Sequence, residues 1–538
     1  MRKLAFVCVL LFGAMGVLAG VPKDVLVIGI KHAAIIDFEP ARVYEIEGSF
    51  VLEQLYDTLV DFEGGGVEAF QRVSPGLAES WEVSADGYTW IFHLRRGARF
   101  HSGREVKADA VVFSLRRALE LDKPPIWILK QFVNSPDDIK ALDDYTVSIT
   151  MNQKIGEMLM GAVLGFQGIC SIVDPEEVKA HATADDPWAT QWLAEHDAGS
   201  GPYKLVEWVR NDRIVLEAFA DYWGGVPRIK RVVLKDIPEP ANQMLLLLKG
   251  DIDVAWNLLP DQIAELKGKK GVKFVSTPTF IFYYAAMNMG MEPFNHEEVR
   301  DAIRYAINYD AIINGILRGE AVPCHTFEPV GLFGHLDLLY PYDPKVAKAL
   351  LDHAGFVDKN GDGWRDYPDG RPLEIELWVR NDPPYTDIAV QIQQDLAKVG
   401  LKLKITQMVY SQLLKFYRAQ KAPMVLVRWG IDYVDPNSNA IPFAHCRTAG
   451  PEAEFKQLAW RNKFCPSGVS DLVEKAVGIL DPVERAEAYK TIQRIVWDIG
   501  PYIIIAQPKF TVGLRANVQG LEVPPIWSFT ELMHVSKE

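Results

Sequence analysis

Cysteine is rare in this sequence, with five residues among 538, which excludes a fold that depends on many disulfides. Cys8 lies in an apolar leader that lacks a lipid-attachment motif, so we predict no lipid anchor. Cys446 and Cys465 are close enough to close a modest loop, and we favour this pair as a disulfide that contributes about 3 kcal/mol. Cys170 and Cys324 are compatible with a second disulfide or with two buried thiols.

Several other features are missing. The chain contains no GxSxG, HExxH or SxxK motif and no P-loop, which argues against a secreted hydrolase. Beyond the first 20 residues it contains no comparably long apolar run, so we expect no membrane span. Basic residues are outnumbered, 57 against 71 acidic ones, and the net charge of −14 argues against a nucleic-acid partner or an anionic membrane surface.

The first 20 residues have the pattern of a secretion signal. Met1-Arg2-Lys3 is basic, Leu4 to Leu18 is apolar, and small residues surround Ala19, near which we predict cleavage. The protein is therefore predicted to act in the periplasm. The mature chain of roughly 519 residues is too long for one hydrophobic core and predicts two to four domains.

Two segments of the chain share a strand–helix–strand pattern in which a glycine ends the helix. The first comprises 232–235, 239–249, Gly250 and 252–255, and the second comprises 373–379, 388–399, Gly400 and 401–406. This pattern predicts parallel βαβ units, and glycine is the expected left-handed residue after a helix. Two such units far apart predict two α/β lobes. Because ligands of open α/β sheets bind beyond the carboxyl ends of the strands, we expect a cleft between the lobes.

A different pattern occurs between residues 77 and 119. The Asp86-Gly87 turn precedes a strand from Tyr88 to Leu94 in which apolar and polar residues alternate. The buried side of the following helix is predicted from spacing: Ala110, Val111, Ser114, Leu115 and Ala118. Strands and a helix in this order predict a compact α+β unit.

The order of these segments resembles that of family 5 of the extracytoplasmic solute-binding proteins, the receptors that hand peptides to ABC importers. Further motifs carry the resemblance over nearly all of the mature chain: 199–205 (GSGPYKL), 221–225 (DYWGG), 249–253 (KGDID), 299–308 (VRDAIRYAIN), 342–344 (YDP) and Ala354-Gly355. The resemblance implies an α/β, bilobed periplasmic-binding-protein fold of type II with an extra inserted domain. The implied parts are lobe I (21–61, 199–277 and 506–538), an inserted α+β domain (62–198) and lobe II, the second jaw (278–505).

The resemblance also implies ligand contacts. Asp432 matches the acidic residue that pairs with the ligand's α-amino group in peptide-binding members, and an ionised carboxylate in a dry cleft favours such a cation. Trp429 resembles a cleft-wall aromatic, Arg380 an arginine that grips the ligand carboxylate in dipeptide-binding members, and Tyr284 a cleft tyrosine of oligopeptide binders. Simpler interpretations stay open: Asp432 in a turn, Trp429 in the core and Arg380 in solvent.

Other patterns favour structural over functional interpretations. Asp358 to Asp369 begins like a calcium loop, but Pro368 and the lack of a following helix favour an Asn/Asp/Gly turn. Asp435 before Pro436 predicts a helix N-terminus. The histidines lack metal-ligand spacing, so we predict no metal site; only His445, near the presumed cleft, suits a nickel chelate, and a core or surface histidine is the simpler interpretation.

Three functions compete. The leading hypothesis is a non-enzymatic, monomeric receptor without a cofactor, whose lobes close on a small peptide before it docks on an ABC permease and ATPase complex. A second keeps the receptor but changes the cargo to an oligosaccharide, an opine or a nickel chelate. A secreted hydrolase is the third.

Overall fold

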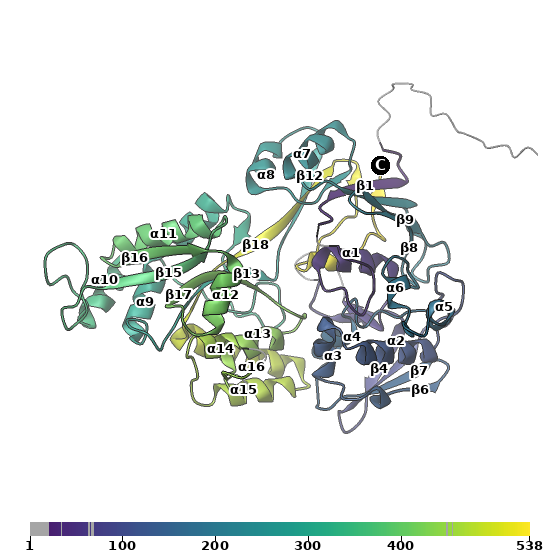
Figure 1. The fold of residues 1–538 in the computed structure, drawn as a ribbon, viewed down its shortest axis with the longest axis horizontal. Helices are drawn as coiled ribbons and strands as arrows, with labels where there is room; N and C mark the ends of the chain where they lie inside the picture. Colours follow the sequence, from purple (N-terminus) through teal and green to yellow (C-terminus); the bar gives the residue numbers. More distant parts are fainter. Residues whose placement is uncertain (1–20, 34, 63–64, 66–68, 448–449, 454–455) are drawn as a thin grey trace, which may run out of the picture.

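The computed structural model describes residues 21–538 apart from residues 34, 63–64, 66–68, 448–449 and 454–455. The predicted secretion signal, residues 1–20, lies outside the described residues. Two groups of helices and strands stand side by side and are connected by long strands (Figure 1). Among the described residues, no helix combines the length and apolar character that crossing a bilayer requires.

The first predicted βαβ segment forms in lobe I. Its elements are β10 (Arg231–Asp236), α7 (Pro240–Lys249) and β11 (Val254–Ala255). Both strands pair in parallel with β1 (Val25–Ile30), which lies between them. Gly250 ends α7 with φ +85°, a conformation in which glycine has no Cβ penalty. The antiparallel strands β9 (Arg213–Ala218) and β8 (Tyr203–Val209) extend this side of the sheet.

The second predicted βαβ segment forms in lobe II. Strands β15 (Glu374–Arg380) and β16 (Lys402–Met408) are parallel neighbours joined by α11 (Tyr385–Ala397). On its other side β15 pairs in parallel with β17 (Met424–Gly430), which pairs antiparallel with β13 (Ile281–Met287). The prediction of two α/β units in opposite lobes is therefore confirmed.

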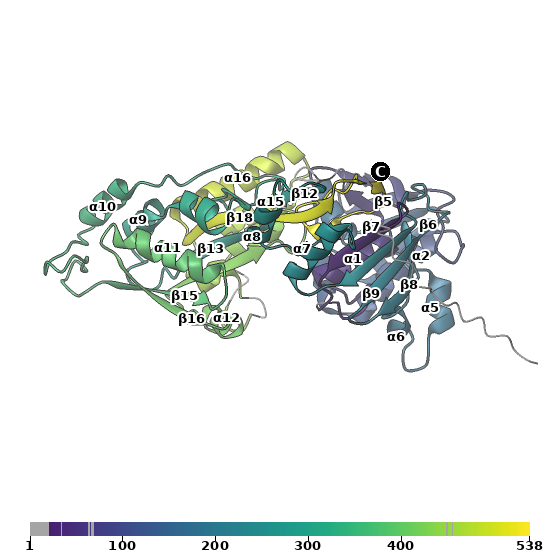
Figure 2. The same cartoon turned by 90° about the horizontal axis from the view of Figure 1, so that it is seen from above.

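One strand belongs to both lobes. The first residues of β18 (Tyr502–Arg515) pair with β13, and its last residues pair with β11 and with β12 (Val272–Pro278). The result is a 12-stranded sheet that continues through both lobes, and β18 crosses between them in two perpendicular views (Figures 1 and 2). The division at residues 505/506, which stays a proposal, falls inside this strand.

The predicted α+β unit is a four-stranded antiparallel sheet with a helix against it. Its strand order is β4 (Ala78–Val83), β5 (Thr89–Leu94), β7 (Thr146–Thr150) and β6 (Ile139–Asp143), and the helix is α2 (Ala108–Leu121). Its hydrophobic core also takes in Phe280, Tyr433 and Val434, so this unit packs against the segment that follows β17 in lobe II.

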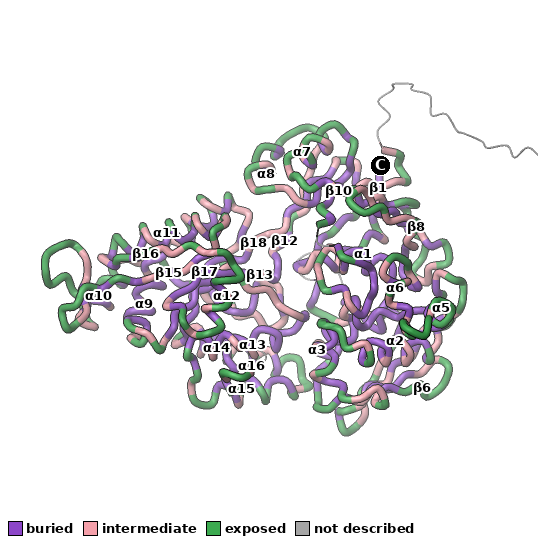
Figure 3. Tube along the Cα trace, in the orientation of Figure 1, coloured by how far each residue is buried: buried purple, intermediate pink, exposed green. Residues whose placement is uncertain are grey.

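Helices and short strands complete the fold, with buried backbone through the middle of each lobe and exposed segments largely at the periphery (Figure 3). In lobe I and the inserted unit these are α1 (Ile46–Leu55), β2 (Val60–Phe62), β3 (Val73–Pro75), α3 (Trp127–Lys130), α4 (Glu157–Leu164), α5 (Pro175–His181), α6 (Thr190–Leu193), α8 (Pro260–Leu266), β19 (Val518–Gln519) and β20 (Ser536–Lys537). In lobe II they are α9 (Glu297–Ala306), β14 (Ala321–Val322), α10 (Pro344–His353), α12 (Tyr410–Arg418), α13 (Asn437–Ala444), α14 (Leu458–Arg461), α15 (Val469–Val477) and α16 (Pro482–Ile499).

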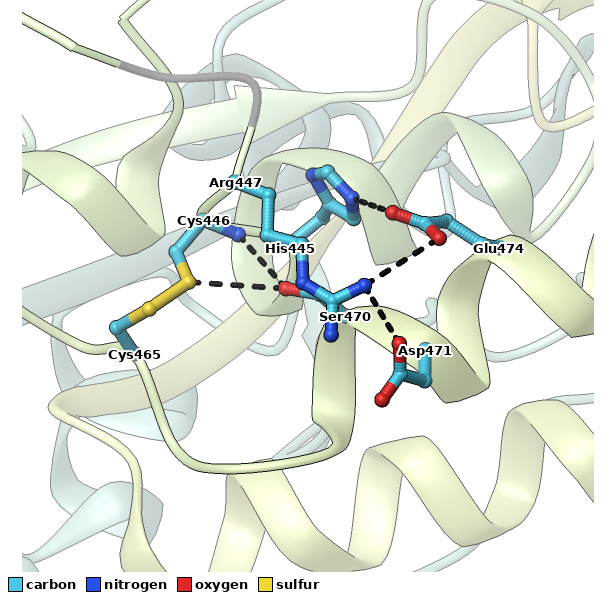
Figure 4. Close-up of a disulfide and its surroundings, with 7 residues drawn as sticks. All are labelled: His445, Cys446, Arg447, Cys465, Ser470, Asp471 and Glu474. Carbon is cyan, nitrogen blue, oxygen red and sulfur yellow. Dashed lines mark hydrogen bonds and ion pairs between the residues drawn. A yellow bond between two sulfur atoms is a disulfide. The ribbon is translucent and has the colours of Figure 1, made fainter.

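The predicted disulfide is confirmed. Cys446 and Cys465 are bonded, and the backbone N–H of Cys446 donates to the Ser470 hydroxyl at 3.2 Å (Figure 4). Cys170 and Cys324 are buried free thiols that belong to different hydrophobic clusters, in the inserted unit and lobe II respectively. Of the two alternatives, the structure therefore shows two buried thiols rather than a second disulfide.

Candidate functional site

A cavity of about 270 Å³ lies between the lobes, beside the strands that connect them. Its lining comes from five segments of the chain: residues 44, 46 and 49; 166–167; 279–281; 428 and 430–434; and 525–529. These segments belong to lobe I, the inserted unit and lobe II. Most of the lining is apolar or aromatic, and a few charged or polar groups point to specific recognition of a small molecule.

Asp432 provides a carboxylate to this cavity. Its segment leaves β17 and is held by a hydrogen bond from the backbone N–H of Asp432 to the Ser438 hydroxyl at 2.8 Å. From lobe I, the Tyr44 hydroxyl donates to Oδ1 of Asp432 at 3.3 Å. Burial raises the pKa of Asp432 to about 6, although the Tyr44 hydrogen bond acts in the opposite direction. Among the described residues, no cation forms an ion pair with this carboxylate.

Arg428 is a second charged residue of the cavity lining and is one that the sequence analysis missed. It lies near the end of β17, with its side chain exposed, and within the described part of the chain it forms no ion pair. The available signal was a single arginine after the apolar run Met424 to Val427, two residues before the strand ends. Arg428 and Asp432 give the same wall of the cavity one positive and one negative group.

Arg380, predicted to bind a ligand carboxylate, already has a carboxylate partner. Its Nε and Nη2 donate to the two oxygens of Asp382 at 2.9 and 2.7 Å. Its guanidinium also lies 4.6 Å from the ring centre of Tyr385 and 4.7 Å from that of Tyr410. Arg380 is not among the lining residues of the cavity. A ligand carboxylate can bind the Arg380 guanidinium bidentately only if the Arg380–Asp382 pair is broken.

The two predicted aromatic contacts, Trp429 and Tyr284, also lie outside the lining. The indole N–H of Trp429 donates to Oδ1 of Asn439 at 2.8 Å, and its ring meets Phe443 edge-on at 5.7 Å. Tyr284 is 1% exposed and packs against Phe443 and Tyr502. Core packing is thus the interpretation that the structure favours for Trp429. We do not carry Tyr284 into the proposed site, because β13 directs its side chain into lobe II.

Asp435 has the structural role expected for it at the start of a helix and has a second, buried partner as well. It accepts from the backbone N–H of Asn437 at 2.8 Å, at the start of α13. Its two oxygens also receive a bidentate pair from Arg485 of α16 at 2.6 and 2.7 Å, and both side chains are at most 2% exposed. A buried ion pair, rather than a cap alone, therefore fixes the turn that carries Asp432.

The two other candidates for metal binding are explained by local contacts. The Asp358 carboxylate accepts from the backbone N–H groups of Gly361 and Gly363 at 2.7 and 2.9 Å, and Asp369 pairs with Arg371. These contacts favour the turn over a calcium loop. His445 lies beside the disulfide rather than in the cavity lining, with Nε2 2.8 Å from Oε1 of Glu474 (Figure 4).

A sheet shared by two lobes, with a mixed-charge cavity between them, defines a two-lobed solute-binding protein. The family described as "Bacterial extracellular solute-binding proteins, family 5 Middle" matches residues 72–451, and this chain belongs to that family. The chain is 30% identical to the dipeptide-binding protein of Escherichia coli, over 88% of this chain and 87% of that protein. The resemblance to family 5 is therefore confirmed.

Solved structures agree with this assignment. HbpA2 from Haemophilus parasuis superposes with a TM-score of 0.82 at 25% identity, covering 96% of this chain and 100% of that one. The periplasmic binding protein DppA from Helicobacter pylori, in complex with the peptide STSA, gives a TM-score of 0.70 at 27% identity, covering 96% and 98%. The predicted bilobed α/β fold of the periplasmic-binding-protein type is thus confirmed.

Proposed function

We propose that this protein is the extracytoplasmic receptor of an ABC importer and that its cavity captures a short peptide. The observation that carries the proposal is the position of Asp432, a half-buried carboxylate without a cationic partner among the described residues, in a cavity that both lobes line. A peptide ammonium supplies the missing counter-charge in a site where water is largely excluded, which strengthens the pair. The peptide ligands of related proteins support the same cargo.

Arg428 is the group that we propose for the acidic end of the ligand, in place of Arg380. Arg428 is a lining residue without an ion-pair partner among the described residues, whereas Arg380 is held by Asp382. Arg428 and Asp432 are four residues apart, so their Cα atoms are at most about 14 Å apart. That spacing, with the flexible arginine side chain, suits a short zwitterion whose apolar side chains contact the aromatic lining.

Other cargoes are less well matched. The described lining contains no histidine, the usual imidazole ligand of nickel, and it is more apolar than a sugar site requires. An opine shares the amino and carboxylate groups of a peptide, so it is the second candidate. We also infer that residues 1–20 are a cleaved signal, that the mature protein works as a periplasmic monomer without a cofactor or catalysis, and that nucleic acid is not a partner.

Calorimetry with a set of di- and tripeptides tests the proposal. We expect micromolar or tighter binding that N-acetylation of the peptide and Asp432→Asn each weaken by about 100-fold, as expected for loss of a charge-assisted pair. Asp261→Asn, on an exposed carboxylate of α8, is the matched control and leaves the affinity unchanged. If the wild-type protein ignores all peptides but binds an opine, the cargo assignment is wrong and the receptor assignment stands. If Asp432→Asn binds peptides normally, the assignment of this residue is wrong.

A further inference from the structure

Three carboxylates meet in lobe I next to the cavity wall. Glu53 belongs to α1, Asp61 to β2, and Glu531 follows the 3-10 turn η5 (Trp527–Phe529). One carboxylate oxygen of each lies within 4.8 Å of the others. This cluster lies outside the proposed peptide contacts, but Trp527 to Phe529 line the cavity two residues before Glu531.

The cluster is deficient in positive charge. Glu53 is 6% exposed, and its Oε2 has no hydrogen-bond partner in the described structure. The Asp61 carboxylate accepts from the backbone N–H of Phe62 at 2.7 Å and is also hydrogen-bonded to the Glu531 carboxyl. The base nearest to Glu531 is the exposed imidazole of His534, at 4.0 Å. Carboxylates this close together repel one another, and the buried Glu53 also loses hydration, so the cluster needs a bound cation or shared protons.

We propose that Glu53, Asp61 and Glu531 form a binding site for a hard divalent cation such as calcium. Calcium–oxygen distances of about 2.3–2.6 Å allow oxygens on opposite sides of one ion to lie up to about 5 Å apart, which fits the spread of this cluster. All three ligands are carboxylate oxygens, the donors that calcium and magnesium prefer over softer metals. The buried, unpartnered oxygen of Glu53 is the group that the ion would satisfy.

The positions of the three carboxylates determine how an ion reaches the site and which parts of the protein it connects. Glu531 is about half exposed, with 48% of its side-chain surface accessible, so an ion can enter from that side and keep water ligands there. The ion joins α1, β2 and the C-terminal segment. Because that segment carries cavity-lining residues, the cation stiffens one wall of the cavity.

Metal titration of the full chain tests this site against proton sharing, the competing explanation. Burial raises the pKa of Asp61 to about 7 and moves those of Glu53 and Glu531 in the same direction. The protein is therefore stripped with EDTA and studied at pH 8, where ionisation is favoured. We expect calcium chloride to raise the melting temperature by several degrees and to bind in a one-to-one ratio by calorimetry, with magnesium chloride as a second probe.

Variants identify the ligands. Glu53→Gln and Asp61→Asn are each expected to abolish the calcium-dependent shift, whereas Asp358→Asn, in the loop at 358–369, retains it. A wild-type protein whose melting temperature ignores both metals overturns the proposal, as does a shift that survives both cluster substitutions. If Glu53→Gln stabilises the protein while the wild type shows no metal dependence, the carboxylates share protons and the site does not exist. The wild-type titration decides the matter even if a variant fails to fold.

Discussion

Tyr44 and Asp432 contact each other across the cavity, with the phenol oxygen 3.3 Å from Oδ1 of the carboxylate. The two residues are 388 positions apart in the chain and belong to opposite lobes. The Tyr44 hydroxyl is a neutral donor, so its hydrogen bond stabilises the carboxylate without neutralising its negative charge. The negative charge of Asp432 therefore has no cationic partner among the described residues, and a ligand ammonium supplies one.

Peptide binding is expected to weaken in acid. Burial raises the pKa of Asp432 to about 6, so below that pH the carboxylate takes up a proton and no longer attracts an ammonium group. The dissociation constant then rises by up to about tenfold per pH unit. Calorimetry between pH 5 and 8 measures this profile, and at pH 6 binding also releases protons, because the ammonium favours the ionised carboxylate. Asp432→Asn supplies the flat reference profile; an equally flat wild-type profile would exclude Asp432 as the partner.

Two neighbouring carboxylates are expected to affect stability in opposite directions. The pKa of Asp432 is raised on folding, so its protonated form stabilises the protein below the ordinary Asp pKa of 3.8, and this stabilisation is lost as the pH rises through about 6. At pH 7.5, Asp432→Asn is therefore expected to stabilise the ligand-free protein by about 1–2 kcal/mol. Asp435→Asn is expected to destabilise it by about 3 kcal/mol, because Arg485 stays buried without its counter-charge.

Urea denaturation of the two variants at pH 7.5 measures both changes. Repeating the experiment at pH 4.5 is informative, since the gain from Asp432→Asn should shrink when the wild-type carboxyl is protonated. If Asp432→Asn is instead less stable than the wild type, the carboxylate is required for the structure, and the interpretation of Asp432 as a turn residue is correct.

The two arginines are expected to differ in their effect on ligands. Arg428→Gln should weaken binding of peptides with a free carboxylate by about 10- to 100-fold and leave their C-terminal amides nearly unaffected, because only the former lose a charged partner. Arg380→Gln, a matched substitution, should change affinity little, since Asp382 already occupies its guanidinium. Competition binding with acid and amide forms of one peptide measures the difference. The reverse order of effects would restore Arg380 as the carboxylate ligand.

Reduction of the disulfide is expected to destabilise lobe II. The bond joins residues 19 positions apart, and closing a loop of this length contributes about 3 kcal/mol by restricting the unfolded chain. Guanidinium denaturation of the wild type with and without dithiothreitol should show this difference, and a Cys446→Ser/Cys465→Ser variant should show no response to the reductant. A response that persists in the double variant would show that the reductant acts on something other than this disulfide.

Local patterns predicted the elements of this fold well. Gly250 ends α7 where the sequence predicted, in the left-handed conformation that follows a helix. Gly400 is also left-handed, but α11 ends at Ala397, two residues earlier than predicted. The predicted helix at 388–399 begins earlier, at Tyr385, because the Pro383-Pro384 segment turns the chain directly into the helix. The disulfide was also predictable, because the two cysteines are near each other in the chain.

The binding site was only partly predictable. Asp432 follows a recognisable strand and family motif, so its position in the cavity agrees with the sequence-based expectation. The partners of Arg380, Trp429 and Tyr284 were not visible, since Asp382, Asn439 and the aromatic cluster of lobe II compete with any ligand for these side chains. Arg428 had no local signal that separated it from a solvated arginine.

By itself, the sequence determined the local and covalent features: the βαβ units, the glycine helix ends, the disulfide and the family. The tertiary structure alone decided which charges remain without a partner. Arg380 meets Asp382 by the local path of the chain. Asp432 meets Tyr44, and Glu531 meets Glu53 and Asp61, only after distant segments pack together. Charge pairing depends on distances of a few ångströms in three dimensions, and separation along the chain does not specify such distances.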